Sequence, residues 1–233
     1  MLTYIRTLGF LSQLSRTKSA KIPMDCCTLC NATDVYLYSQ TDKRKYYRCQ
    51  NCKFIYLDSK DRLSPNDEKN RYDLHNNNPL DKQYREFLAR LYEPIYKKIK
   101  IGDKGLDYGC GPGPALAAMF NEQGFAVDLY DPFYFPDKSH LSKKYNFITC
   151  SEVAEHFYKP AKEFREIDKV LVKGGWFGMM TNLYDDSTSF ESWYYRKDPT
   201  HVSFYSKETL HKIASIMSWN IEELNHNVVL FQK

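Results

Sequence analysis

The sequence predicts an α/β protein: an open, mostly parallel sheet with helices, preceded by a small ribbon that a metal holds together. Three observations support this. Two Cys-x-x-Cys pairs lie near the front of the chain, a strand, a glycine loop and a helix follow one another from residue 105, and strand-like and helix-like segments alternate from there to the end. The 233 residues suffice for one full-sized domain and a small accessory unit, but not for two large domains.

Composition and charge exclude several classes of protein. The 42% apolar and 27% charged residues are typical of a packed globular chain, which excludes a disordered or collagen-like one. Charged residues interrupt every apolar run before the roughly 18 residues that a membrane-spanning helix needs. The net charge of +4 equals the four basic residues of segment 1–24, which contains no acid, so the rest of the chain is neutral. Because nucleic-acid-binding proteins usually have a clustered basic excess, the charge disfavours that class.

The first 24 residues form a separate N-terminal extension. Arg6 and Gln13 interrupt the apolar core that a secretory signal requires, so we expect the protein to stay inside the cell, in the cytoplasm. The acid-free, amphipathic composition of this extension leaves a mitochondrial transit peptide as the alternative. The seven cysteines are then kept reduced and serve metal binding or packing instead of disulfides.

Residues 25–58 are predicted to form a zinc ribbon. Cys27, Cys30, Cys49 and Cys52 form two pairs separated by 18 residues, a spacing with which two Cys-x-x-Cys turns bind one structural Zn²⁺ ion. Alternating apolar and polar residues between the pairs predict short hairpins, and a unit of this size needs the metal to fold. The metal-bound ribbon is nearly neutral, which favours a scaffolding or substrate-docking role over phosphate binding.

Residues 59–100 are predicted to contain a polar linker and one helix. The stretch up to Asp81 is turn-rich, with Pro65, Pro79 and three consecutive Asn residues. A helix follows, with Asp81 as its N-cap and a kink at Pro94. Packing against the core explains its apolar stripe, which consists of Tyr84, Phe87, Leu88, Leu91, Ile95 and Ile99.

A glycine loop within residues 105–113 carries the main functional signal. A short apolar strand ends at Asp107, and Gly109, Gly111 and Gly113 then lead into a helix. Glycines allow the backbone to approach a ligand closely, and the N-terminus of the following helix attracts an anionic group. The Gly-x-Gly-x-Gly spacing differs from the Gly-x-Gly-x-x-Gly of dinucleotide-binding proteins, so a nicotinamide cofactor is disfavoured.

The glycine spacing and the acid two residues before it resemble motif I of the class I S-adenosylmethionine-dependent methyltransferases. The resemblance implies a Rossmann-like fold, with S-adenosylmethionine as the cofactor and the loop near its methionine end. It also implies that Asp131, at the end of the next strand, accepts the ribose hydroxyl protons, with Asp128 as the alternative. Ser151 and Glu152 end a buried strand, whose carboxyl end faces the ligand crevice in open α/β sheets. The expected cofactor-binding residues are therefore Asp107, Gly109, Gly111, Gly113, Asp131, Ser151 and Glu152.

The remaining segments follow the order of that methyltransferase fold over residues 101–233. A strand, an amphipathic helix stopped by Gly174 and Gly175, and a fifth strand follow the second strand. The last helix has Ser206 as its N-cap, and a terminal hairpin around residues 225–227 matches the reversed final strand of the family. The sequence departs from the family in one respect: a third strand is short or absent, so we name no adenine contact.

The catalytic residues are expected just after Ser151. Glu152-x-x-Glu155-His156 resembles an element of ubiquinone-type O-methyltransferases that lies beside the transferred methyl group and can hold a divalent cation such as Mg²⁺. We expect His156, or His201 further along the chain, to take the acceptor proton, while Glu155 or the cation orients the acceptor. The alternative is structural: Glu155 caps a helix and His156 packs against the fifth strand.

Residues 189–205 follow the fifth strand, where this fold usually builds the acceptor pocket. The segment is rich in ring side chains, which suits an aromatic-walled pocket formed by Trp193, Tyr194, Tyr195, His201 and Tyr205. Arg196 is a candidate anchor for an anionic acceptor. The alternative is a loop that packs its aromatic side chains onto the body of the protein.

The sequence thus predicts an S-adenosylmethionine-dependent methyltransferase with one structural Zn²⁺, which acts by O-methylation on a small-molecule acceptor. Methyl transfer from a sulfonium is an in-line displacement, so the protein mainly aligns the acceptor and removes its proton. Two alternatives stay open: a ribosomal RNA methyltransferase and a non-catalytic zinc-ribbon binding protein. The residues identify neither the acceptor nor the oligomeric state.

Overall fold

The structure is a computed structural model that describes residues 26–74, 77–223, 225 and 227–233. The expectations for the N-terminal extension, including the transit peptide, lie outside these residues. No helix among the described residues combines the length and the apolar character needed to cross a membrane.

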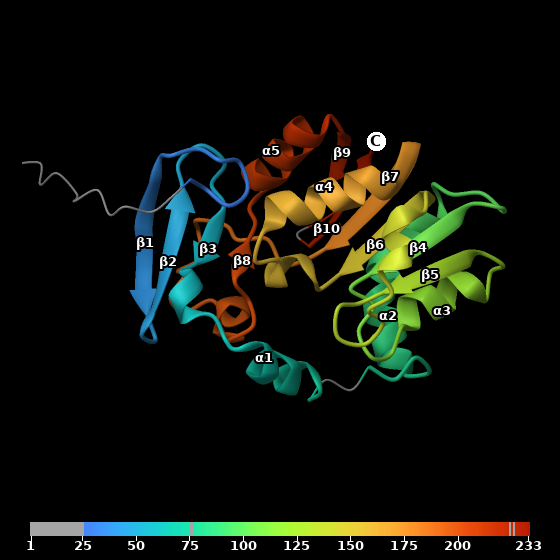
Figure 1. Cartoon of the computed structure of the whole chain (residues 1–233), viewed down its shortest axis with the longest axis horizontal. Coiled ribbons are helices and arrows are strands. Elements are labelled where there is room, and N and C mark those ends of the chain that lie inside the picture. Colours follow the sequence, from blue (N-terminus) through green and yellow to red (C-terminus); the bar gives the residue numbers. More distant parts are fainter. Residues whose placement is uncertain (1–25, 75–76, 224, 226) are drawn as a thin grey trace, which may run out of the picture.

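A six-stranded mixed sheet forms the centre of the molecule (Figure 1). Its strands, in the order β5-β4-β6-β7-β10-β9, are Ala126–Tyr130, Lys104–Tyr108, Tyr145–Ser151, Leu171–Met180, Val228–Gln232 and Asn220–Glu223. The first four are parallel, whereas β10 pairs antiparallel with both β7 and β9. This arrangement confirms the predicted α/β sheet with a reversed C-terminal strand.

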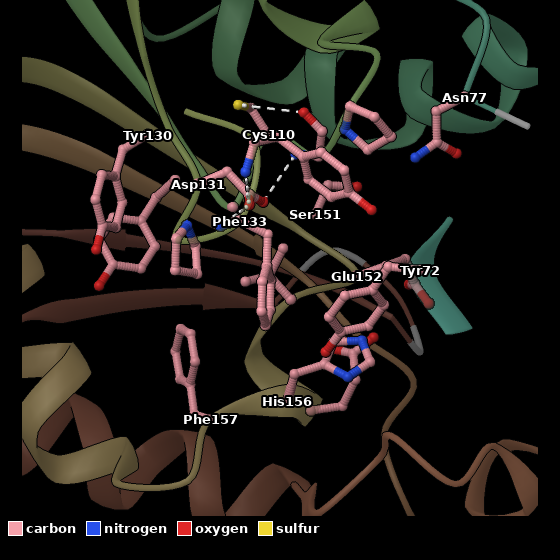
Figure 2. Close-up of a pocket in the computed structure, with 18 of the residues that line it drawn as sticks. Tyr72, Asn77, Cys110, Tyr130, Asp131, Phe133, Ser151, Glu152, His156 and Phe157 are labelled. Atoms are coloured by element: carbon pink, nitrogen blue, oxygen red, sulfur yellow. Dashed lines mark hydrogen bonds between the residues drawn. The ribbon is translucent and has the colours of Figure 1, made fainter. Parts of the chain in front are cut away.

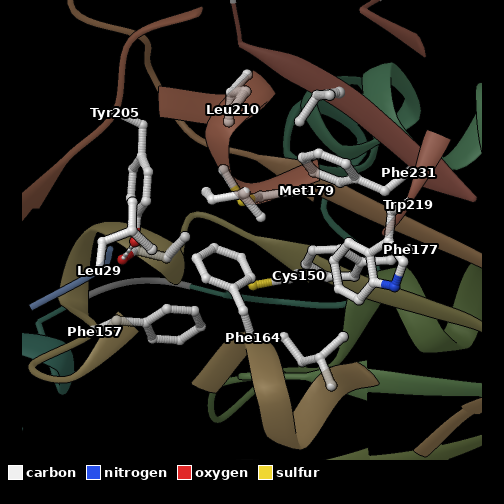
Figure 3. Packing of buried hydrophobic residues seen from close by; sticks show 14 of the residues in the cluster. Leu29, Cys150, Phe157, Phe164, Phe177, Met179, Tyr205, Leu210, Trp219 and Phe231 are labelled. Atoms are coloured by element: carbon white, nitrogen blue, oxygen red, sulfur yellow. Dashed lines mark hydrogen bonds between the residues drawn. The ribbon is translucent and has the colours of Figure 1, made fainter. Parts of the chain in front are cut away.

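Two pairs of helices cover the two faces of this sheet. On one face lie α2 (Lys82–Tyr96) and α3 (Ala115–Asn121), which pack on Phe147 and Leu230. On the other face lie α4 (Pro160–Val170) and α5 (Lys207–Met217), which pack on Phe177 and Phe231 (Figure 3). Neighbouring residues of β10 thus serve opposite faces, because successive side chains of a strand alternate.

The zinc-ribbon segment forms a second, antiparallel sheet at one end of the molecule (Figure 1). Its strands are β1 (Val35–Thr41), β2 (Arg44–Cys49) and β3 (Ile55–Leu57), which confirms the predicted hairpins. A fourth strand, β8 (Ser203–Phe204), comes from the C-terminal part of the chain and pairs with β3. The ribbon is therefore joined to the large domain by backbone hydrogen bonds as well as by side chains.

A short helix, α1 (Pro65–Tyr72), lies in the stretch for which the sequence predicts only a linker. Ser64 caps it by accepting a hydrogen bond from the backbone N–H of Asp67, and Pro65 occupies its first turn. The prediction was wrong because the segment has almost no apolar residues, and apolar periodicity is the main signal for a helix.

The predicted stop of α4 at Gly174 and Gly175 is also wrong. The helix ends at Val170, and β7 begins at once and contains both glycines. Gly174 has a φ of 78°, and the register between β6 and β7 shifts between Tyr145 and Phe147, so the glycines accommodate an irregular start of the strand.

Short 3₁₀ turns complete the chain, at Ser59–Asp61, Lys138–Ser142, Ala154–His156 and Tyr194–Lys197. The second of these occupies the place of the missing third strand, so that β5 is the edge of the large sheet. This agrees with the expectation that the third strand is short or absent.

Candidate active site

A cavity of about 550 Å³ lies at the carboxyl ends of β4, β5 and β6, where open α/β sheets bind their ligands. Its wall combines the glycine loop, the turn after β5, the segment after β6 and two helices from the N-terminal half, α1 and α2. Figure 2 shows Tyr72, Glu152 and His156 toward one end of it, and Tyr130 and Phe157 toward the other.

The glycine loop has the conformation and the crowding that require glycine. Gly109 and Gly111 have φ values of 80° and 63°, in the left-handed region. A Cβ on Gly109 would lie 2.5 Å from the methyl groups of Val153, and one on Gly113 would lie 1.7 Å from the carbonyl oxygen of Asn77. Gly109 and Gly111 line the cavity, as predicted for cofactor-binding residues, whereas Gly113 packs against Asn77 and does not.

Asp107 lies behind the loop and not on the cavity wall. Its Oδ1 accepts a hydrogen bond from the Thr149 hydroxyl at 2.8 Å, which connects β4 to β6. Burial raises the pKa of Asp107 to about 6, against the opposing effect of this hydrogen bond. The structure thus gives Asp107 a bracing role, in place of the cofactor contact expected from the sequence.

Asp131 lines the cavity and organises two loops around it. Its Oδ2 accepts from the backbone N–H of Gly111 at 3.1 Å, and its Oδ1 accepts from those of Phe133 and Tyr134 at 2.8 and 3.1 Å. The carboxylate therefore faces the space in front of the glycine loop and fixes the turn after β5.

Two polar atoms at the end of β6 have no hydrogen-bond partner among the described residues although they are buried. They are Ser151 Oγ and Glu152 Oε1, and both side chains line the cavity. Glu152 has a φ of 52°, a strained conformation for a residue with a side chain, and such strain clusters at functional sites. Burial, and then the charge of Glu155, raise the pKa of Glu152 to about 8. These atoms fit a cofactor that offers hydrogen-bond donors and positive charge, as S-adenosylmethionine does.

Glu155 is fully buried at the inner end of the cavity. Its Oε2 accepts from the Thr181 hydroxyl at 2.9 Å, and its Oε1 accepts from the hydroxyl of Tyr195. The Tyr195 oxygen also lies 3.2 Å from Glu152 Oε2, so this hydroxyl bridges the two carboxyl groups. Burial raises the pKa of Glu155 to about 7.

His156 and His201 lie side by side in the cavity wall, with ring centroids 4.9 Å apart. The Nδ1–H of His156 donates to the carbonyl oxygen of Thr200 at 3.0 Å, and that of His201 donates to the carbonyl oxygen of Tyr195 at 2.6 Å. This tautomer makes Nε2 the proton-accepting atom of each ring. Burial lowers the pKa of His156, which keeps the ring neutral and able to accept a proton.

The cation site expected from the sequence differs from what the structure brings together. Glu155, His156 and His201 each offer one ligand atom, and these atoms lie within 4.8 Å of one another, whereas Glu152 is not part of the group. Two of the three donors are imidazole nitrogens, which suit transition metals, while Mg²⁺ prefers oxygen ligands and water. The donor set does not fit Mg²⁺, so we derive no step through this ion.

The aromatic segment 189–205 contributes less to the cavity than the sequence predicts. Of its five expected side chains only His201 lines the wall, while Tyr195 reaches it through the carboxyl groups described above. Tyr205 packs on Phe54 of the ribbon, with ring centroids 5.3 Å apart, and Tyr194 is exposed. Most of these rings therefore form the contact between the ribbon and the large domain, which is the packing alternative.

Arg196 does not anchor a substrate anion either. Its side chain is 2% exposed and forms an ion pair with Asp42 of the ribbon at 2.8 Å. The guanidinium also donates to the carbonyl oxygens of Phe190 and Glu191. Its donors hold the segment against the ribbon and do not reach the cavity.

The aromatic wall of the cavity comes from residues that the sequence analysis missed or assigned to the core. They are Tyr72 of α1, Tyr84 and Phe87 of α2, Tyr108 of β4, Tyr130 of β5, Phe133 and Tyr134 after β5, and Phe157 and Tyr158 after β6. Glu68 joins them: its two carboxylate oxygens accept from the hydroxyls of Tyr72 and Tyr158 at 2.7 and 3.0 Å. Glu68 and Tyr72 are four residues apart, the spacing that places two side chains on one face of a helix, and this was the signal that could have found them.

The four predicted zinc ligands converge on one point. The Sγ atoms of Cys27 and Cys52 lie 3.7 Å apart, those of Cys30 and Cys49 lie 3.6 Å apart, and all four lie within 4.8 Å of one another. Four sulfurs around one Zn²⁺ with bonds of about 2.3 Å are about 3.8 Å apart in a tetrahedron. The cluster therefore has the size that a tetrahedral zinc site requires.

Comparisons with known proteins agree with the fold and the cavity. A family model described as a methyltransferase domain matches residues 80–223, which is more than half of the chain. No protein with a curated description matches it. Among solved structures, the 1,6-didemethyltoxoflavin-N1-methyltransferase of Burkholderia thailandensis, with bound 1,6-didemethyltoxoflavin and S-adenosylhomocysteine, is similar with a TM-score of 0.51. The two are 12% identical, and the similarity covers 84% of this chain and 98% of that one.

Two further solved structures are similar at lower scores. A SAM-dependent methyltransferase from Archaeoglobus fulgidus is 17% identical, with a TM-score of 0.48 over 66% of this chain and 95% of that one. An O-methyltransferase family protein from Burkholderia thailandensis is 11% identical, with a TM-score of 0.46 over 71% of this chain and 62% of that one. Since the family model covers the glycine loop and most of the large sheet, the chain belongs to the methyltransferase-domain family and is a class I S-adenosylmethionine-dependent methyltransferase.

Proposed function

We propose that the enzyme methylates a hydroxyl oxygen of a small-molecule acceptor inside the cavity. The observation that carries this proposal is the half-buried, neutral imidazole of His156, oriented by its bond to Thr200 and placed in the same cavity as the glycine loop. A hydroxyl group has to lose its proton as it is methylated, whereas a carboxylate acceptor would need no base.

The residues proposed to hold the cofactor are those on the wall around the glycine loop: Gly109, Gly111, Asp131, Ser151 and Glu152. S-adenosylmethionine supplies an electrophilic methyl group on a sulfonium. The two glycines leave room for close approach, and Asp131 offers its carboxylate in front of the loop. The unpartnered Ser151 Oγ and Glu152 Oε1 complete this set, since buried polar atoms require partners.

The residues of the chain align the acceptor and move one proton. A new bond forms between the acceptor oxygen and the methyl carbon while the bond from carbon to sulfur breaks, and the hydroxyl proton passes to Nε2 of His156. His201 and the Glu155–Tyr195 pair lie beside this position and orient the acceptor. The aromatic wall excludes water from the reacting groups.

A small molecule is favoured over RNA as the acceptor because none of the described residues that line the cavity is a Lys or an Arg. RNA binding depends on cationic side chains that contact phosphates. Two cations of the ribbon sheet are engaged inside the molecule, whereas Lys45 is exposed: Arg48 pairs with Asp186 at 2.6 Å, and Arg44 donates to the carbonyl oxygen of Pro199 at 2.8 Å. These two arginines are therefore not available to contact phosphates.

The proposal is tested with S-adenosylmethionine labelled in its methyl group. The enzyme is incubated with a cell extract, and the label is measured separately in the small-molecule and RNA fractions. We expect label in small molecules, and His156→Ala should lower its rate of transfer by roughly 10²- to 10⁴-fold. Affinity for S-adenosylhomocysteine should stay unchanged. His211→Ala, at an exposed position of α5, is the matched control.

Three results would contradict parts of this proposal. Label found only in RNA would favour the ribosomal RNA alternative. Transfer that survives both His156→Ala and His201→Ala within a few-fold would remove the base and with it the hydroxyl acceptor. A larger loss in His201→Ala than in His156→Ala would move the base to the second imidazole.

We also propose that residues 25–58 bind one structural Zn²⁺ through Cys27, Cys30, Cys49 and Cys52, and that the ribbon supports the segment after β7. The tetrahedral separation of the four sulfurs supports the metal. The pairing of β3 with β8 and the ion pairs that cross to Asp186 and Arg196 support the second role. The segment held in this way carries Tyr195 and His201, both of which act in the cavity.

A further inference from the structure

We propose that the acceptor carries a basic nitrogen and enters the cavity as a cation, so that the substrate is a hydroxyl compound with an amine group. This inference rests on the proposed function and names the class of its substrate. It follows from the acidic side chains in the cavity wall, from the tyrosine hydroxyls that hydrogen-bond to Glu68 and Glu163, and from the aromatic rings around Glu68.

As far as the described part of the chain forms it, the cavity wall is acidic and contains no Lys or Arg. Five carboxylic acids line it: Glu68, Asp131, Glu152, Glu155 and Glu163. Within the described residues none of the five acids forms a salt bridge with Lys or Arg. Ionised carboxyl groups that are buried without a cation are unfavourable, and burial accordingly raises the pKa of Glu152 and of Glu155. A positively charged ligand favours the ionised form of these acids, whereas an anion does not.

The cofactor accounts for only part of this charge. S-adenosylmethionine has a sulfonium, an ammonium and a carboxylate, and therefore one net positive charge. Asp131 is expected at its ribose, and Glu163 accepts from the hydroxyl of Tyr108, which packs on Tyr130 toward the end of the cavity away from Tyr72. Glu152 belongs to the residues proposed to hold the cofactor, so Glu68 and Glu155 are the acids left for the acceptor.

Glu68 is the clearest of these acids. It is 7% exposed, and both of its oxygens accept hydrogen bonds from tyrosine hydroxyls, which are neutral donors. The hydroxyls of Tyr72 and Tyr158 hold the carboxylate in place without neutralising it. Arg62 interacts with Glu68 electrostatically and lies over the Tyr158 ring at 4.6 Å, but within the described residues it forms no ion pair with Glu68. A buried carboxylate oriented by neutral donors is a preformed partner for an ammonium group.

Aromatic rings surround the same end of the cavity. Tyr72 lies 5.6 Å from Phe133 and 5.2 Å from His156, between ring centroids. Tyr134 and Tyr158 line the wall beside them. The faces of aromatic rings attract cations, and rings combined with a carboxylate are the usual means of binding an ammonium group.

The test measures binding of three phenols to the full chain saturated with S-adenosylhomocysteine. Tyramine, 4-ethylphenol and 3-(4-hydroxyphenyl)propionate share a phenol ring and a two-carbon arm, and differ in carrying a positive, no or a negative charge. We expect tyramine to bind roughly tenfold or more tightly than 4-ethylphenol, and the acid to bind more weakly than both. Equal or tighter binding of 4-ethylphenol or of the acid, or no binding of tyramine, would overturn the inference.

Substitutions of Glu68 locate the effect. Glu68→Gln should remove the preference for tyramine over 4-ethylphenol, and Glu68→Asp, which keeps the charge, should retain it. Glu86→Gln, an exposed acid of α2 outside the cavity, should leave the preference intact. An unchanged preference in Glu68→Gln, with the S-adenosylhomocysteine affinity and the thermal stability of the unmodified chain, would exclude Glu68 as the cation partner.

The labelled-methyl experiment separates the two proposals. A labelled small molecule without an amine would overturn this inference and leave the proposed function in place. Failure to label any small molecule, together with preferential binding of tyramine, would overturn the proposed function while supporting the cation-binding cavity.

Discussion

Gly111 has a left-handed backbone on the wall of the cavity, with only the side-chain amide of Asn77 close to where a Cβ would lie, at 3.3 Å. A Gly111→Val substitution strains this conformation and fills the space in front of the loop. We expect it to abolish binding of S-adenosylmethionine in calorimetry. Gly102→Val is the control, because Gly102 has a φ of 97° with nothing nearby and lies outside the cavity. Equal loss in both variants would attribute the effect to strain alone.

Asp107 makes stability depend on pH in a defined direction. Its pKa rises from 3.8 to about 6 on folding. At pH values between these two, the folded state therefore binds more protons than the unfolded state. The free energy of unfolding of the wild type, measured relative to Asp107→Asn, should therefore fall as the pH rises from about 4 to about 6, by up to about 3 kcal/mol. Above that range the difference should be constant.

Urea unfolding at a series of pH values measures this difference. Asp34→Asn, at an exposed position of the ribbon, is the control for the general effect of removing one carboxylate. A difference between wild type and Asp107→Asn that does not change with pH would mean that the pKa of Asp107 is the same in the folded and unfolded states.

At the scale of single residues, the sequence predicted correctly those site residues whose type is required by their backbone conformation or by their place at the end of a strand. Glycines with left-handed conformations and acids at strand ends are recognisable from spacing, and Gly109, Gly111, Asp131 and Glu152 do line the cavity. Glu68 could not be found in this way. Its spacing of four residues from Tyr72 places the two on one face of a helix, but that this face meets the cavity depends on how α1 packs across the turn after β5, which the sequence does not record.

The ribbon and the segment after β7 are held together by specific contacts. Arg48 is 8% exposed, donates to both carboxylate oxygens of Asp186 at 2.6 and 2.8 Å, and lies over the ring of Tyr38. The guanidinium also holds the pKa of Asp186 below its usual range. This ion pair connects the ribbon to the segment that follows β7 and contains Tyr195.

We expect Arg48→Met to loosen that segment without affecting the cofactor. The free energy of unfolding should fall by about 1 to 3 kcal/mol, because a charge-assisted pair is lost. Hydrogen exchange should become faster in residues 189–201, methyl transfer should slow, and S-adenosylhomocysteine affinity should remain the same. Arg165→Met, exposed on α4, is the control. Unchanged exchange in residues 189–201 would show that the ribbon does not support this segment.

At the scale of helices and strands, the sequence predicted elements with strong periodicity or caps. The N-caps at Asp81 and Ser206 are confirmed by their side-chain hydrogen bonds. Helix α1 was missed because its stability comes from its cap and from contacts outside the helix, such as the bond from Arg71 to Asp198. The two glycines inside β7 looked like a helix stop, because a bulge and a C-cap require the same residue.

Zinc should stabilise the whole molecule and not the ribbon alone. Cys27, Cys49 and Cys52 belong to the same buried cluster as Phe164 and Tyr205 of the large domain. We expect one zinc per chain by elemental analysis, and a lower melting temperature for the entire chain after chelation. Cys30→Ser should lose the metal, whereas Cys26→Ser, next to the cluster but exposed, should retain it. A zinc content near zero in protein purified without chelator would contradict the site.

At the scale of the whole molecule, the order of elements was predictable and the joining of the two sheets was not. Family resemblance and alternation fixed the sequence of strands and helices from residue 101 onward. Strand β8 has only two residues, and no two-residue segment carries a recognisable strand signal. It pairs with β3 across about 150 residues of chain, and no local pattern predicts a contact at that distance.

The pairing of Ile55 with Phe204 has a consequence for the order of folding during synthesis. The ribbon leaves the ribosome first, but the strand that completes its sheet follows about 150 residues later. Contacts between positions so distant in the chain form slowly, and an uncovered strand edge attracts other chains. Until Ser203 and Phe204 have been made, β3 is such an edge. A nascent chain that stalls before this point is therefore the form of the protein most prone to aggregate.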